Sequence, residues 1–223
     1  MNVGLLRRLV AELIGSALLA ALVIGSGIAA QRLSPDDVGL QLLESAFATA
    51  LGLPVLILVF APISGAHFNP VVSLVDSISG LRSWRDTALY IPTQIIGCIG
   101  GAVLANLMFA DPAITISTTE RLTPAHFLAE VVATAGLILV IFSLARSDRA
   151  NLTPVAVGAY IGAAYFFTSS ASFANPAITI GRMFSDTFAG IAPSSAPGFI
   201  LAQLIGAAIG HLLVRLLHPA RRA

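Results

Sequence analysis

The sequence predicts an all-α membrane protein with six transmembrane helices and two re-entrant half-helices, arranged as an inverted repeat. Of its 223 residues, 57% are hydrophobic and only 10% are charged. A soluble domain of this length cannot hide so much apolar surface from water. Two stretches, "SGAHFNPVVSL" at residues 64–74 and "SASFANPAITI" at residues 170–180, each set Asn-Pro before about ten apolar residues. Such a run is too short to cross a bilayer.

Composition excludes several classes of function. The formal net charge of +1 offers no field for recruiting nucleic acid. The single Cys98 excludes an internal disulfide framework and a Cys-rich metal site. We find no nucleophile–base pair, metal cluster or cofactor loop, so the sequence predicts no enzymatic activity, no metal and no cofactor.

Apolar runs of roughly twenty residues recur along the chain, as transmembrane helices require. A signal peptide is an alternative for the first run, but its length and Glu12 favour a retained helix. The half-helices are expected near 69–80 and 175–185. The six spans are expected near residues 9–30, 40–60, 87–109, 126–145, 153–170 and 197–218.

The arginines predict the orientation in the bilayer. With a cytoplasmic N-terminus, only Arg32, Arg121 and Arg182 fall on the outer side, as the positive-inside rule favours. Both termini are therefore expected in the cytoplasm. The nine arginines on the cytoplasmic side are Arg7, Arg8, Arg82, Arg85, Arg146, Arg149, Arg215, Arg221 and Arg222.

The two halves of the chain share polar landmarks. Glu12 and Glu130 stand near the start of the first span in each half, and Gln94 and Gln203 open a Gln-x-x-Gly pattern in the last. Three spans per half is an odd number, so the second copy must run through the membrane upside down. We expect a single domain over 1–223, with inverted repeats of about 1–112 and 121–223. Such repeats place a pathway near the bilayer midplane.

The Asn-Pro segments suit helices that begin inside the membrane. Asn can cap a helix and Pro fits its first position. About ten helical residues rise roughly 15 Å, so two such helices from opposite faces would meet at the midplane. Their positive dipole ends would repel a cation there, whereas a neutral molecule could bind the Asn amides.

At these residues the chain resembles the major intrinsic protein family of aquaporins and aquaglyceroporins. The resemblance covers the whole chain, and it departs at Val71, where Ala is usual. It implies a bilayer-embedded homotetramer with one pore per subunit, and the short loops suggest a bacterial inner membrane. Exclusion of cations by the two helix ends is already the established account of aquaporin-type pores. The residues of the two motifs are Asn69, Pro70, Val71, Asn175, Pro176 and Ala177.

The resemblance also implies where a selectivity filter lies. The family usually has an Arg directly after the second motif, but here Ile178 stands there. Offsets from the two asparagines place Thr49, Ala163 and Ser172 beside it. A filter of these residues should be wide and uncharged. It suits a small neutral solute such as glycerol or arsenous acid, with some water, and resembles a bacterial branch associated with arsenic resistance.

Alternatives stay open for several residues. Arg182 is read either as a displaced filter residue or, with slight preference, as a side chain that reaches outward to water or to Asp186. Glu12 and Glu130 are read as acceptors for the re-entrant backbone rather than as proton relays, with Gln94 and Gln203 as structural polar residues. His67 is expected to line the pore as a neutral hydrogen-bonding group.

Two rival functions also remain. A water-selective aquaporin is one alternative. An ion-coupled secondary transporter is the other, but it would need an ionisable group on the short segments. None lies within 69–73 or 175–180.

Overall fold

The computed structural model describes residues 4–219, and every regular element in this range is helical. Arg221 and Arg222, two of the arginines used for orientation, lie outside the described residues. Within the described range, six helices are long and apolar enough to cross a membrane. The prediction of six spans is therefore confirmed. These helices are α1 (Leu5–Leu33), α2 (Val38–Ser64), α4 (Trp84–Met108), α5 (Pro124–Arg146), α6 (Thr153–Phe167, preceded by the short 3₁₀ helix η1, Ala150–Leu152) and α8 (Ala196–Leu217).

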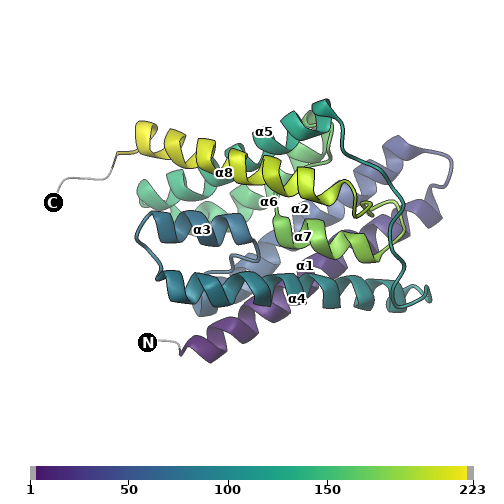
Figure 1. Ribbon diagram of the computed structural model, residues 1–223, viewed down its shortest axis with the longest axis horizontal. Coiled ribbons are helices and arrows are strands. Elements are labelled where there is room, and N and C mark those ends of the chain that lie inside the picture. The colour runs from purple at the N-terminus through teal and green to yellow at the C-terminus, as the bar shows by residue number, and fades with distance from the viewer. Residues whose placement is uncertain (1–3, 220–223) are drawn as a thin grey trace.

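Two short helices complete the fold. The helix α3 spans Pro70–Ile78 and α7 spans Pro176–Gly181, and α7 is followed by the 3₁₀ helix η2 at Arg182–Phe184. Each half of the chain therefore contains two long helices, one short helix and a last long helix. In Figure 1 the short helices lie end to end across the middle of the molecule, pointing in opposite directions.

The molecule has two distinct ends. The helix α1 begins and α8 ends at the same end, which we call the terminal face (Figure 1). The opposite end, the far face, carries the connectors of residues 34–37, 109–123 and 185–195. Hydrogen bonds join the second and third of these connectors: Asp186 Oδ1 accepts from both the backbone amide and the hydroxyl of Thr118.

Glycines let the first and last long helix of each half pack closely. A Cβ at Gly101 of α4 would lie 2.1 Å from the carbonyl oxygen of Ala17 on α1, and one at Gly210 of α8 would lie 2.6 Å from that of Ala135 on α5. Small residues at such crossings let helix backbones approach within a membrane. Gly100, the neighbour of Gly101 on α4, is instead exposed and has nothing near its Cβ position.

Large apolar side chains cover the outer surface of the helix bundle. Leu43, Phe47 and Leu51 on α2 are all more than half exposed, and Leu128 on α5 is equally exposed. An apolar exterior is stable only in lipid or against another apolar surface. The bundle thus turns its polar residues inward, toward the meeting point of α3 and α7.

Candidate functional site: a pore between two half-helices

Each half-helix begins at an asparagine that caps it. Asn69 Oδ1 accepts a hydrogen bond of 3.1 Å from the amide of Val71, and Asn175 Oδ1 accepts one of 2.9 Å from that of Ala177. Pro70 and Pro176 occupy the first helical position, where no N–H is required. The sequence pattern Asn-Pro therefore encodes the start of both helices.

The two asparagines also tie the half-helices together. Asn69 Nδ2 donates to the carbonyl of Ala174, and Asn175 Nδ2 donates to that of Phe68, both at 2.8 Å. An amide nitrogen has two N–H donors, so each asparagine keeps one for another partner. Both side chains line the central cavity, where that partner can be a solute.

Two buried carboxylates hold the loops that lead into the half-helices. Glu12 accepts hydrogen bonds from the amides of His67 and Phe68, the Ser64 hydroxyl and the Gln94 amide, at 2.6–3.0 Å. Phe68 has a positive φ of 49°, which is unfavourable for a side chain of its size. The carboxylate therefore stabilises a strained backbone that no helix or sheet supports.

The second half repeats this arrangement. Glu130 accepts from the amides of Phe173 and Ala174, the Ser170 hydroxyl and the Gln203 amide, at 2.6–2.9 Å. Ala174 has a φ of 47°, like its counterpart Phe68. All four oxygens of the two carboxylates thus accept hydrogen bonds from protein donors. Both glutamates act as acceptors for the backbone of the re-entrant loops.

A cavity of about 150 Å³ runs past the tips of the half-helices. Most of its wall is apolar and comes from α1, α2, α5 and α6, including Leu19, Leu53 and Ile161. Polar groups enter from the two loops and from Asn69 and Asn175. Val71 and Ala177 are fully buried and pack behind the cavity instead of lining it.

Three of the four predicted filter residues line this cavity, namely Thr49, Ser172 and Ile178. Ala163 does not: it is exposed on the outer surface of α6, so its assignment to the filter is wrong. The residue of α6 that lines the cavity here is Tyr165, whose hydroxyl lies 3.1 Å from Thr49 Oγ1. A helix turns by about 100° per residue, so an offset error of two residues moves a side chain to the opposite face.

Arg182 also lines the cavity and is only 5% exposed. The preferred expectation, a side chain that reaches out to water or to Asp186, is therefore wrong. Its Nε donates to the carbonyl of Ala189, and its guanidinium carbon lies 3.5 Å from the centre of the Phe173 ring. The cavity wall near Ile178 therefore carries a guanidinium group, although the four residues placed by offsets predicted an uncharged filter.

Sequence reasoning missed two residues here, Tyr165 and Phe173. A signal existed for each. Tyr165 is a tyrosine within an apolar helix, and a buried tyrosine hydroxyl needs a partner. Phe173 stands two residues before Asn175, in the loop that must approach the cavity.

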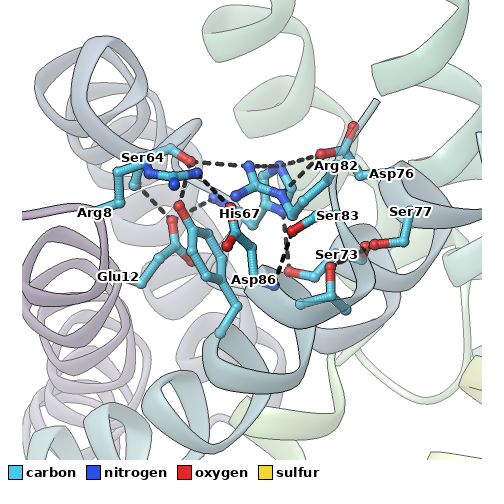
Figure 2. Close-up of polar contacts among 12 residues, drawn as sticks. Arg8, Glu12, Ser64, His67, Ser73, Asp76, Ser77, Arg82, Ser83 and Asp86 are labelled. Carbon is cyan, nitrogen blue, oxygen red and sulfur yellow. Dashed lines mark hydrogen bonds and ion pairs between the residues drawn. The ribbon is translucent and has the colours of Figure 1, made fainter. Parts of the chain in front are cut away.

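His67 lines the cavity toward the terminal face, and a charged cluster lies behind it (Figure 2). Its Nδ1 lies 3.0 Å from Ser73 Oγ, and its Nε2 lies 3.3 Å from Arg82 Nη2. Arg82 also pairs with Asp76 at 3.0 Å and stacks over Tyr90 at 4.2 Å. Both ring nitrogens of His67 thus already have protein neighbours, which leaves mainly the carbon edge of the ring for a solute.

The major intrinsic protein family model matches residues 1–174, more than three quarters of the chain. The chain belongs to the major intrinsic protein family. Aquaglyceroporin AqpS of Rhizobium meliloti (strain 1021) is 48% identical to it over 97% of this chain and 93% of the relative. Aquaporin Z of Brucella melitensis is 30% identical over 94% and 96%.

A solved structure is also similar to this chain in three dimensions. The aquaglyceroporin from Plasmodium falciparum superposes with a TM-score of 0.73 at 22% identity, covering 95% of this chain and 96% of that one. With the six apolar helices, family membership establishes a multi-pass membrane channel for small neutral solutes.

Proposed function

We propose that this channel passes arsenous acid and glycerol passively, with some water. The observation that carries the proposal is Ile178, an apolar residue on the cavity wall at the position directly after the second Asn-Pro-Ala. An arginine at that position would narrow the cavity and favour a single file of water. Ile178 leaves room for a solute with three hydroxyl groups. The 48% identity to a protein named as an aquaglyceroporin supports the same class.

The cavity presents both surfaces that such a solute needs. Leu19, Leu53 and Ile178 provide an apolar side, against which a carbon backbone or an arsenic atom can lie. Thr49, Tyr165 and the free N–H groups of the asparagines provide hydrogen bonds for hydroxyl groups. A pore with few, well-placed polar groups on an apolar wall is selective for small neutral molecules.

The transport is passive in this proposal. A coupled transporter binds its driving ion near the midplane, at an ionisable group on a broken helix. The first turn of each half-helix carries no such group, and Asp76 at the end of α3 is paired with Arg82. We further propose that the protein has no enzymatic activity.

We place the channel in a bacterial inner membrane with both termini in the cytoplasm. It forms a homotetramer with one pore per subunit, as the family resemblance implies. Each subunit is one domain over 1–223, built from repeats of about 1–112 and 121–223. The exposed apolar side chains of α2 and α5 support burial against lipid or a neighbouring subunit.

Flux into sealed vesicles tests the proposal. Purified protein is reconstituted, and glycerol-driven swelling and arsenous acid uptake are measured with and without an imposed proton or sodium gradient. We expect flux of both solutes that is independent of either ion gradient. Water flux alone would instead assign a water-selective pore, and flux that requires an ion gradient would assign a coupled transporter.

A further inference from the structure

Two arginines meet one aromatic ring at the far mouth of the cavity. The guanidinium carbon of Arg182 lies 3.5 Å from the ring centre of Phe173, and that of Arg121 lies 5.6 Å from it. Arg121 belongs to the connector before α5, Phe173 to the loop before α7, and Arg182 to η2. The connector before α5 therefore meets the two segments that flank α7 in the chain.

The same arginines hold three consecutive carbonyls of the last far-face connector. Arg121 donates from Nη2 to Phe188 O at 2.7 Å and from Nε to Gly190 O at 2.6 Å. Arg182 donates from Nε to Ala189 O, between them. Ala189 in turn packs against Gly27 of α1, where a Cβ would come within 2.8 Å of the alanine Cβ. The direction of the Arg182 guanidinium is thus fixed by its own contacts and, through the connector, by Arg121.

The remaining donors of Arg182 have no protein partner. Within residues 4–219, no acceptor takes a hydrogen bond from its Nη1 or Nη2, although the side chain is 5% exposed and lines the cavity. Neither Arg121 nor Arg182 forms an ion pair with a carboxylate in the described range. Glu120, next to Arg121, is instead bound by the hydroxyls of Ser194 and Ser195.

We propose that Arg182 determines solute specificity at the far mouth by donating hydrogen bonds to the oxygen atoms of a neutral polyhydroxy solute. Arg121 is a positioning residue that holds the connector so that these donors point into the cavity. This inference rests on the proposed function, because it names the group that distinguishes glycerol or arsenous acid from water at the same pore.

The chemistry of the guanidinium supports this role. It is planar and presents several N–H donors in a fixed arrangement, so it can bind two hydroxyl oxygens of one molecule at once. Stacking on Phe173 holds the plane, while Ile178 offers an apolar surface one turn deeper along the cavity. A solute with several hydroxyl groups can accept more hydrogen bonds from such a site than a water molecule can. A water molecule can already accept hydrogen bonds from the central asparagines.

The test compares solute and water permeability in reconstituted vesicles. Arg182→Met keeps the length of the side chain but removes its donors, so we expect the ratio of glycerol to water permeability to fall roughly tenfold. Arsenous acid uptake should fall in parallel. Arg121→Met should lower the same ratio to a lesser extent and should add nothing in the Arg182→Met background, because it acts through Arg182.

Arg32→Met is the matched control. Arg32 is also an arginine of the far face, but it pairs with Asp111 outside the pore cavity, so the permeability ratio should stay at the parent value. Arg182→Lys keeps the charge without the planar donors and should fall between the parent and the methionine variant. An unchanged ratio in folded Arg182→Met protein would overturn the inference. A parent that passes water but neither solute would overturn the proposed function and this inference with it, whereas a parent that passes both solutes, with an unchanged ratio in Arg182→Met, would overturn this inference alone.

Discussion

Asn69 and Asn175 each donate a hydrogen bond of 2.8 Å to the carbonyl of the residue that precedes the other asparagine. This exchange joins the tips of α3 and α7, although the two residues come from opposite halves of the chain. Each asparagine side chain also caps its own helix through Oδ1. One side-chain amide therefore starts a helix, joins the two halves of the chain and keeps one N–H free for a solute in the pore.

Replacing Asn69 with Asp should admit cations or prevent folding. A carboxylate cannot donate to Ala174, and its negative charge would offset the positive ends of the two half-helices. We expect a potassium leak into vesicles that the parent does not show, or a loss of monodisperse protein. A folded Asn69→Asp protein that carries solute at the parental rate without any leak would contradict this account of charge exclusion.

Restoring the usual arginine with Ile178→Arg should lower the flux of glycerol-sized solutes strongly while some water permeation survives. The new guanidinium would lie deeper than Arg182, beside Thr49 and Tyr165, and would narrow the cavity. Vesicle swelling with glycerol and arsenite uptake by cells would report the change.

Thr49→Phe should act similarly by bulk alone, because Thr49 lines the cavity next to Tyr165. Ala163→Phe is its control, since Ala163 is exposed on the outside of α6. The same flux assays apply to both variants. Equal loss of flux in the two would show that added bulk disturbs the fold rather than the pore.

Glu130→Gln should destabilise the protein rather than abolish proton coupling. The amide would replace an acceptor that faces backbone donors of Phe173 and Ala174, at a cost of about 1.5–3 kcal/mol for each charge-assisted bond lost. Thermal unfolding in detergent measures the effect, and Glu44→Gln, at a half-buried position on α2, is the control. Unchanged stability together with the loss of a pH dependence that the parent flux shows would favour a proton relay.

A methyl group at Gly101 should weaken the packing of α1 against α4. Gly101→Ala would place its Cβ 2.1 Å from a backbone oxygen that cannot move freely, and such overpacking costs about 1–3 kcal/mol. Gly100→Ala lies next to it in open space and should be neutral or slightly stabilising. Thermal unfolding of the two variants in detergent compares them directly.

Much of the fold could be predicted from the sequence because its signals are local. A run of about twenty apolar residues must span the bilayer, and Asn-Pro before a shorter run encodes a capped helix start. Glu12 and Gln94 in the first half recur as Glu130 and Gln203 in the second. This repetition indicated which polar residues occupy equivalent positions in the two halves. Each of these features depends on a few neighbouring residues and on the thickness of the membrane.

The sequence alone thus determined six spans, two half-helices and the family to which the channel belongs. Only the tertiary structure decided which side chains form the far mouth. Ala163 and Tyr165 are two residues apart on one helix, and the packing of α6 against α2 selects Tyr165 as the one that meets Thr49. Arg182 turns inward because Phe173, before α7, and Ala189, in the connector after it, together provide a ring face and a carbonyl at the position of its guanidinium. Such contacts exist only after the chain has folded, so no local pattern around Arg182 could specify them.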